Sequence, residues 1–234
     1  MSYTGVIING TDTLEEWGLI LLDDVVHGEA PLKMTLLNVP GADGTLNASY
    51  GMTGGIPVFD NRTIKFSLFA SGLTKTGTTL THSRPKNESE VDEIRGELQG
   101  LYHGREVDVI LPDDPDHHYH GILSVGDKSG YNSGKIPITL LAYPYKLKNT
   151  VTEQLITIPP GGSTNVTLTN EGRRVTPTIT CNAATPITKG SDTWSIQAGE
   201  RVISGLYLDA GSTTLNIAGT SGKTVNFTYQ EGRL

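Results

Sequence analysis

Hydrophobic and polar residues alternate along much of this chain. Between residues 62 and 69, Ile64, Phe66 and Leu68 are separated by other residues, so their side chains share one face of an extended strand. Residues 32–36 follow the same period of two. The pattern predicts half-buried strands in both places and favours a mainly β protein.

One stretch departs from this alternation and has the period of a helix. Asn87 can act as the N-cap, and Glu90, three residues later, completes a capping-box pattern. Gly104 stands where a left-handed residue ends many helices. Apolar residues at spacings of three and four lie on one stripe, namely Val91, Ile94, Leu98 and Leu101. We therefore expect an amphipathic helix over about 88–103 that packs on the strands.

The character of the sequence changes after Pro144. From residue 151 onward, short strand-forming runs are separated by Gly, Pro, Asn and Ser at intervals of about ten residues. This spacing is typical of an antiparallel β-sandwich, and a length of 234 residues suits two small domains. We predict an N-terminal β-sandwich-like domain with one α-helix over 1–147, and a C-terminal β-sandwich over 148–234.

Composition and charge argue against several classes of protein. Only 18% of the residues are charged, and the formal net charge of -7 argues against nucleic-acid binding, which needs clustered Lys and Arg. The single Cys181 excludes an internal disulfide and a cysteine-based zinc site. The N-terminus has no basic and apolar leader, and no run of 18 apolar residues occurs. We therefore expect neither Sec export nor a membrane partner.

The segment 39–44 is predicted to have a fixed, irregular shape. Its Pro-Gly and Asp-Gly pairs, which end at Gly41 and Gly44, require positive φ angles at two places. A second glycine-rich stretch covers 51–55. Two interpretations of the 39–44 loop remain open, a tight surface turn and a loop that contacts another subunit.

Three histidines form the densest group of potential metal ligands. His117, His118 and His120 lie near several aspartates, and His118 and His120 would point from the same face of a strand. No matching His or Cys pair completes a usual zinc spacing, so an exposed turn leading into a strand accounts for them as well. The chain has no nucleophile elbow, P-loop or dinucleotide fingerprint. We expect no catalytic residue, metal or cofactor.

Aromatic residues in the C-terminal half offer a different kind of candidate site. Trp194 and Tyr207 could stack on a sugar ring, although core or interface packing is the more frequent role of such side chains. They define the alternative in which this half is a glycan-binding module.

Three phrases, in order, give the chain a resemblance to a known family. The first is Val-Pro-Gly-Ala-Asp-Gly-Thr-Leu-Asn at 39–47, followed by Phe-Asp-Asn-Arg-Thr-Ile at 59–64. The second is Leu-Gln-Gly-Leu-Tyr-His-Gly-Arg at 98–105 with Asp-Pro-Asp-His-His-Tyr-His-Gly at 114–121. The third is Ala-Tyr-Pro-Tyr-Lys at 142–146, with a Tyr where Asp is common in the family. On these phrases the chain resembles the distal tail (Dit) proteins of siphophages, in sequence over 5–148 and by architecture beyond.

The resemblance implies a structural virion protein rather than an enzyme. Dit-like proteins have an N-terminal β domain with one helix, which forms a hexameric ring, and a C-terminal galectin-like β-sandwich. The ring joins the tail tube to the tail-tip protein and carries receptor-binding proteins in many phages. By this resemblance we expect a homo-oligomer at the distal end of a phage tail, as one ring or two stacked rings, made and assembled in the host cytoplasm.

The same resemblance implies the partners and the interface. We expect the major tail protein and a tail-tip (tail-associated) protein as partners, with receptor-binding proteins as a further group, and DNA that passes through the lumen without specific binding. The glycine-rich loops supply the candidate interface residues Val39, Gly41, Asp43, Gly44, Gly54 and Gly55. The alternatives are a module that recognises host-surface saccharide through Trp194 and Tyr207, and a metal-dependent hydrolase built on the three histidines.

Overall fold

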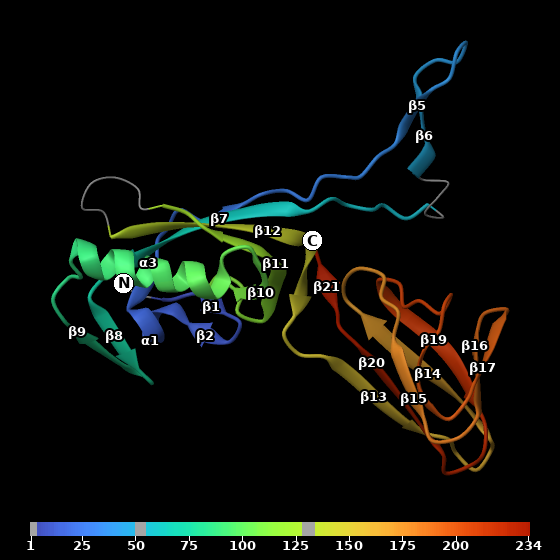
Figure 1. Cartoon of the computed structure of the whole chain (residues 1–234). Helices are drawn as coiled ribbons and strands as arrows, with labels where there is room; N and C mark the ends of the chain where they lie inside the picture. Colours follow the sequence, from blue (N-terminus) through green and yellow to red (C-terminus); the bar gives the residue numbers. More distant parts are fainter. Residues whose placement is uncertain (1–3, 50–54, 128–133) are drawn as a thin grey trace. The chain divides into compact units, whose positions relative to one another are not determined.

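The computed structural model describes residues 4–49, 55–127 and 134–234. The chain divides into two compact units, Met1–Lys146 and Leu147–Leu234, and both are built mainly from β-strands (Figure 1). The predicted mainly β fold is therefore confirmed. Among the described residues, no helix is long and apolar enough to cross a membrane.

One large sheet forms the frame of the first unit. Its strands lie in the order β2-β1-β10-β11-β12-β7-β3, and β4 also pairs with β7. In β7, Ile64, Phe66 and Leu68 are buried as the alternation predicts. The strands of this sheet are β1 (Ile7–Ile8), β2 (Thr11–Asp12), β3 (Leu19–Leu21), β4 (Val26–His27), β7 (Arg62–Ala70), β10 (Arg105–Ile110), β11 (His117–Val125) and β12 (Lys135–Lys148).

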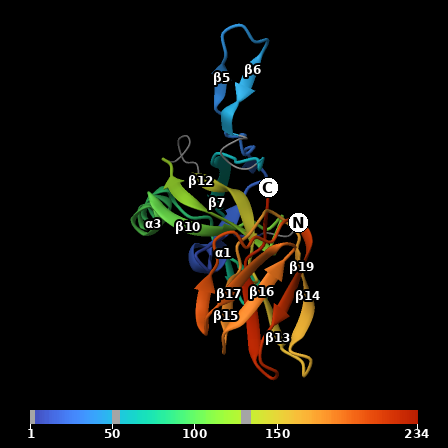
Figure 2. The same ribbon diagram turned by 90° about the vertical axis from the view of Figure 1, so that its right-hand side faces the viewer.

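The predicted helix is α3 (Glu88–Tyr102), and it packs on one face of this sheet (Figure 2). The capping box is present: the Glu90 amide donates to Asn87 Oδ1, and the Asn87 amide donates to the Glu90 carboxylate. Hydrogen bonds from Arg84 and from the Asn87 amide lower the pKa of Glu90 to about 2. Gly104 has the expected positive φ of 73°.

The apolar face of α3 differs from the prediction at its last position. Val91, Ile94 and Leu98 are buried in the core, but Leu101 is 44% exposed. Tyr102 is buried instead, and its ring meets that of Trp17 edge to face at 6.3 Å between centroids. In the last turn of α3, Tyr102 rather than Leu101 therefore faces the core, because its ring reaches Trp17.

A short helix, α1 (Thr13–Trp17), precedes β3 and was not predicted. The Leu14 amide donates to the side chain of Asp12, the N-cap, and Gly18 ends the helix with a positive φ of 66°. A Cβ atom on Gly18 would lie 2.4 Å from the Leu73 carbonyl oxygen, so glycine is required there. After α1 the chain forms two short strands, β3 and β4.

Two hairpins leave the sheet of the first unit. β8 (Leu73–Thr76) pairs with β9 (Thr79–His82), and β5 (Leu36–Asn38) pairs with β6 (Thr45–Asn47). The first lies within the polar, threonine-rich segment 71–86. The run 32–36 leads into the second hairpin and reaches β5 only at Leu36; it was predicted to be half-buried, but its apolar residues are exposed.

The second unit is a β-sandwich of two four-stranded antiparallel sheets. The strand orders are β13-β20-β15-β18 and β14-β19-β16-β17. Both sheets contribute to one core, in which Ile179, Phe227, Leu168 and Ile217 are fully buried. Its strands are β13 (Thr152–Thr157), β14 (Ser163–Asn170), β15 (Thr178–Cys181), β16 (Thr185–Lys189), β17 (Asp192–Ile196), β18 (Gly199–Val202), β19 (Gly211–Ala218) and β20 (Thr224–Tyr229). The short strand β21 (Gly232–Arg233) belongs to neither of these two sheets and pairs with β12.

A buried carboxylate connects three segments of the second unit. Glu231, whose side chain is 9% exposed, accepts hydrogen bonds from the Glu171 amide at 2.8 Å and the Thr152 hydroxyl at 2.7 Å. Lys148 Nζ lies 3.5 Å from the same carboxylate. Burial alone would raise the pKa of Glu231, but these hydrogen bonds and the nearby charge outweigh it, and the pKa lies below its ordinary value.

Candidate assembly surface

The β5–β6 hairpin is the end of a long arm that projects from the first unit (Figures 1 and 2). We define the arm as the described residues between 31 and 60. Near its base, the Asp60 amide donates to the Pro31 carbonyl at 2.8 Å, and the Lys33 amide donates to the Val58 carbonyl at 2.7 Å. Farther out, β5 and β6 pair in register, with Leu37 opposite Leu46.

The root of the arm is fixed to the sheet. Arg62 Nε donates to the Gly28 carbonyl at 2.8 Å, and the Gly28 amide donates to the Thr63 carbonyl at 2.9 Å. The Arg62 guanidinium also lies 5.6 Å from the centre of the Tyr119 ring, within the range of a cation–π contact. A Cβ atom on Gly28 would lie 2.4 Å from the Thr63 carbonyl oxygen, so only glycine fits this crossing. The arm is thus attached through specific contacts on β7 and β11.

The tip of the arm has the irregular backbone that the sequence predicts. Gly41 and Gly44 have φ angles of 84° and 75°. The Ala42 amide donates to the Val39 carbonyl at 3.1 Å, which closes the turn. Val39 and Asp43 are exposed, and a Cβ atom on either glycine would meet nothing within 4 Å. The tip is therefore an open, preformed loop.

Of the two remaining interface candidates, Gly54 and Gly55, the structure describes only Gly55. Gly55 has a φ angle of 85° and lies where the arm returns toward β7, whereas Gly54 lies outside the described residues. The role of all six residues in an interface stays a prediction.

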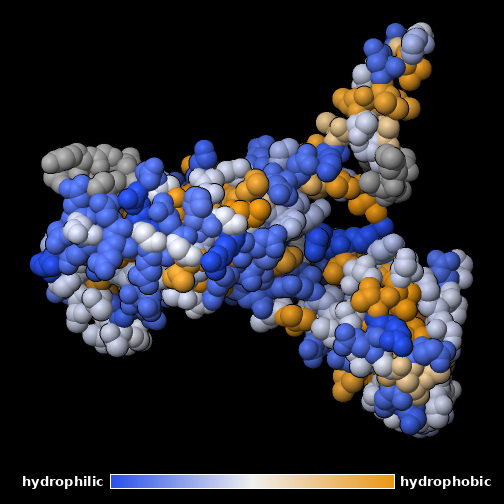
Figure 3. Space-filling view, in the orientation of Figure 1, coloured by the Kyte–Doolittle hydropathy of each residue, from blue (hydrophilic) through white to orange (hydrophobic). Residues whose placement is uncertain are grey.

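Apolar side chains are exposed to solvent along most of the arm (Figure 3). Leu37 is 48% exposed and Leu46 is 60% exposed, although they lie directly opposite each other. Between residues 31 and 59 the sequence has only two charged residues, Lys33 and Asp43. The exposed apolar residues of the arm are Leu32, Met34, Leu36, Leu37, Val39, Leu46 and Val58. Because an isolated two-stranded hairpin is marginally stable in water, this surface is suited to contact with another protein surface.

A second exposed apolar surface lies on the sheet of the first unit. Ile122 on β11 is 41% exposed, and Leu141 and Tyr143 on β12 are 43% and 48% exposed. Their neighbours in sequence, such as Leu123 and Ala142, are buried toward α3, so these three residues point to the opposite face. We call Ile122, Leu141 and Tyr143 the stripe.

The histidines near the stripe form pairs with carboxylates. His117 Nδ1 lies 2.9 Å from Asp114 Oδ1, and His120 Nδ1 lies 2.6 Å from Asp108 Oδ1. The ring of His120 also stacks on that of Tyr143, with centroids 5.5 Å apart. His118 Nε2 is 3.9 Å from Asp108 Oδ1. In the described part of the chain, no group of three or more His, Cys, Asp or Glu side chains could hold a metal ion.

The two aromatic candidates for glycan binding occupy different surroundings. Trp194 on β17 is partly buried and packs against the core of the second unit. Tyr207 is 36% exposed, and the Arg174 guanidinium lies 5.0 Å from its ring centre. Arg174 also forms an ion pair with Asp209 at 2.5 Å. The Arg174 guanidinium therefore contacts one face of the Tyr207 ring. Glycan binding by Trp194 and Tyr207 stays a prediction.

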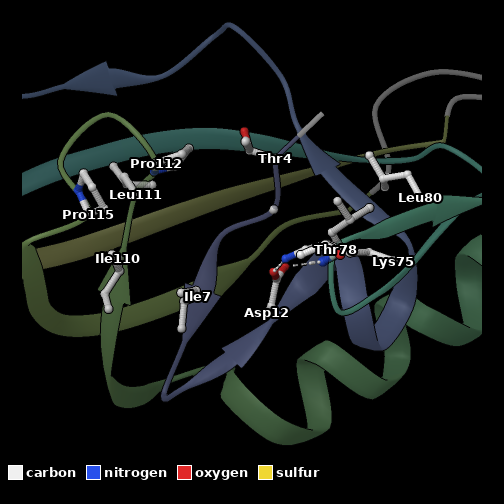
Figure 4. Close-up of a pocket in the computed structure, with 12 residues that line it drawn as sticks. Thr4, Ile7, Asp12, Lys75, Thr78, Leu80, Ile110, Leu111, Pro112 and Pro115 are labelled. Carbon is white, nitrogen blue, oxygen red and sulfur yellow. Dashed lines mark hydrogen bonds and ion pairs between the residues drawn. The ribbon is translucent and has the colours of Figure 1, made fainter. Parts of the chain in front are cut away.

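A pocket of about 410 Å³ lies between β1, β2 and the β8–β9 hairpin (Figure 4). Asp12 and Lys75 are the ionisable residues among those that line it. Lys75 Nζ lies 2.7 Å from Asp12 and 3.0 Å from Glu15. These hydrogen bonds raise the pKa of Lys75, so the amine stays protonated and is not available as a base. The remaining lining is mostly aliphatic, such as Ile7 and Leu80, and assembles no catalytic set.

Apart from Val39, the exposed apolar residues of the arm and of the stripe were not among the interface candidates predicted from the sequence. The prediction placed the interface at the glycine-rich tip, whereas the larger apolar area belongs to the flanking Leu36, Leu37 and Leu46. A usable signal was the lack of charge between 34 and 42, because exposed edge strands usually carry charged residues.

Comparison with known proteins gives one informative result. No family model and no curated protein matches the chain. Among solved structures, the chain is similar to the crystal structure of the SPP1 Dit protein (gp 19.1), described as a paradigm of hub adsorption apparatus in Gram-positive infecting phages. The identity is 16%, the TM-score is 0.60, and the match covers 98% of this chain and 99% of that chain. The expected likeness to Dit is thus confirmed at the level of the fold, and the chain shares its mainly β fold with the SPP1 Dit protein.

Proposed function

We propose that the chain is a structural component of a phage tail, the hub of the adsorption apparatus at its distal end. The observation that carries this proposal is the likeness in fold to SPP1 Dit over nearly the full length of both chains. A likeness limited to one unit would support only a shared module. Here the likeness covers 98% of this chain and so includes both of its units.

We infer that this role is structural rather than catalytic. The ionisable side chains described at the pocket and near the stripe contact one another, as with Lys75 and Asp12 or His120 and Asp108. The exposed features of the first unit are instead apolar surfaces and a preformed loop. Such surfaces serve contacts with other proteins.

The proposed ring has six copies, and the exposed apolar residues of the arm support the association of one copy with another. Fully burying a Leu, Ile, Val or Met side chain contributes about 1.5–3 kcal/mol, so burying the exposed half of one contributes about 1 kcal/mol. The seven apolar arm residues together offer several kcal/mol at each contact between copies. This gain can offset much of the entropy lost on association, which is estimated at 4–15 kcal/mol. The proposed ring exists singly or as two rings stacked together.

In this proposal the ring connects tail components. The major tail protein lies on one side and the tail-tip protein on the other, while receptor-binding proteins attach at the outside. The net charge of -7 is compatible with DNA that passes through the lumen without being retained. The chain is assembled in the host cytoplasm before it becomes part of the virion.

The test is to locate the chain in purified phage particles. Mass spectrometry of the tails should detect it, and gold-labelled antibodies against the second unit should mark the tail end that contacts the host. Antibodies against a capsid protein serve as the control for labelling. The proposal fails if particles that contain all the other tail proteins do not contain this chain. It also fails if the antibodies against this chain label the capsid.

A further inference from the structure

The arm exposes apolar side chains that its own unit leaves uncovered. Leu37 and Leu46 lie opposite each other on one side of the hairpin, and each is close to half exposed or more. Leu36 points to the other side because side chains alternate along a strand, and it is 53% exposed. Both sides of the arm are thus apolar. An occupant that covers it must present a surface of the same kind.

The stripe is such a surface, and it belongs to the same chain. Ile122 and Leu141 sit on central strands of the sheet, so the stripe lies on a rigid support. A flat sheet face accepts a two-stranded ribbon by face-to-face packing of side chains. Tyr143 is held in place by its stack on His120 and by its hydroxyl, 3.4 Å from Glu106 Oε1. The side chains that would receive the arm are therefore ordered in advance.

The charges around the two surfaces are compatible with docking. Glu106 and Asp108, on β10, border the stripe, since Glu106 lies opposite Ile122 and Asp108 lies opposite His120 in the sheet. The only basic residue in the segment 31–59 is Lys33, near the base of the arm. The outer arm carries only Asp43, at its tip. An arm laid with Leu37 and Leu46 on the stripe therefore buries no cluster of like charges.

We infer that the arm of one copy of this chain docks on the stripe of a neighbouring copy. The inference rests on the proposed ring and specifies its contact. Arm and stripe are different surfaces of one chain, so the contact is head to tail, and each copy offers one donor and one acceptor. Contacts of this kind close into rings when the rotation between copies divides a full turn. The partner that covers the stripe is thus a second copy of this chain.

Two variants separate the donor from the acceptor. The arm variant combines Leu37→Lys with Leu46→Glu, a cross-strand pair in which opposite charges are tolerated. The stripe variant combines Ile122→Lys, which faces Glu106, with Leu141→Glu. Each variant alone should need about a thirtyfold higher concentration than the wild type for half assembly, because the burial of two half-exposed Leu or Ile side chains is lost. Circular dichroism and thermal unfolding check that both fold, and Thr at the same positions replaces the charges if one does not.

Mixing the variants gives the decisive measurement. The stripe variant keeps an intact arm and the arm variant keeps an intact stripe, so an equimolar mixture should form dimers of about 50 kDa that cannot grow further. Light scattering measures these masses. A control variant with Leu155→Ser and Val202→Ser, the most exposed aliphatic residues of the second unit, should assemble like the wild type.

The other outcomes discriminate between the two proposals. If the wild type assembles and the stripe variant assembles equally well, or if the mixture yields no dimer, the arm docks elsewhere and only this inference is overturned. If the wild type itself remains a monomer of 25.1 kDa, the proposed ring and this inference fail together.

Discussion

Replacing Glu231 with Gln should destabilise the second unit without affecting the first. One carboxylate oxygen of Glu231 accepts a hydrogen bond from the Glu171 amide. The other oxygen accepts hydrogen bonds from the Thr152 hydroxyl and from Lys148 Nζ. In Gln one of these oxygens becomes an NH2 group, which places a donor against a donor. Hydrogen bonds to a charged group contribute about 1.5–3 kcal/mol. We therefore expect the variant to lose about 2 kcal/mol of the free energy of unfolding of this unit.

The effect of this substitution should depend on pH. Because the pKa of Glu231 is lower in the folded unit than in the unfolded chain, the ionised carboxylate stabilises the fold above the ordinary glutamate pKa of about 4.3. This stability is lost as the pH falls through the depressed pKa. The difference between wild type and Glu231→Gln should thus be largest near neutral pH and should shrink in acid.

Urea unfolding followed by tryptophan fluorescence measures this difference. Trp17 lies in the first unit and Trp194 in the second, so a Trp17→Phe background leaves one reporter in the unit of interest. Glu153→Gln, at an exposed position on β13, is the matched control and should change the stability by less than about 0.5 kcal/mol. A Glu231→Gln protein as stable as this control at pH 7, or a loss that persists unchanged in strong acid, would refute the reasoning.

Three further predictions concern the helix, the arm and the aromatic pair. Asn87→Ala removes the N-cap of α3 and should cost about 1 kcal/mol of the stability of the first unit, measured by thermal unfolding; an unchanged midpoint would count against the cap. Gly44→Ala places an L-residue at a φ of 75° in open space, so the free arm should relax to another loop conformation, and the cost of about 1 kcal/mol to restore the original one on docking should raise the concentration for half assembly about fivefold. Gly96→Ala, in α3 and equally free of clashes, should instead leave assembly unchanged. A glycan array probed with the full chain should give no binding, and binding lost on Trp194→Ala or Tyr207→Ala would favour the saccharide alternative.

The helix α3 could be predicted because its signals are local. The N-cap, the capping box and the apolar spacing all lie within the segment they determine, and the positive φ at Gly104 follows from the same segment. The helix α1 has five residues and no complete period of its own. Its ends depend on Asp12 and on the fit of Gly18 against Leu73, a residue far away in the sequence.

The arm shows where the sequence pattern is ambiguous. Alternating apolar residues at 32–36 resemble those at 64–68, yet the first run is exposed and the second is buried. Periodicity reveals which side chains share a face, but not whether this face is covered by the same chain. The positive φ angles at Gly41 and Gly44 were predictable because they follow from the residue type. The stripe was missed for the complementary reason, because its exposure depends on α3 covering only the opposite face of the sheet.

Electron microscopy of the purified, full-length chain tests the central claim most directly. If copies of this chain are the main partners of its exposed apolar surfaces, the images should show six-fold rings with a mass of about 150 kDa, or twice that for a stacked pair. Particles that remain single chains of 25.1 kDa at the highest attainable concentration would contradict the account.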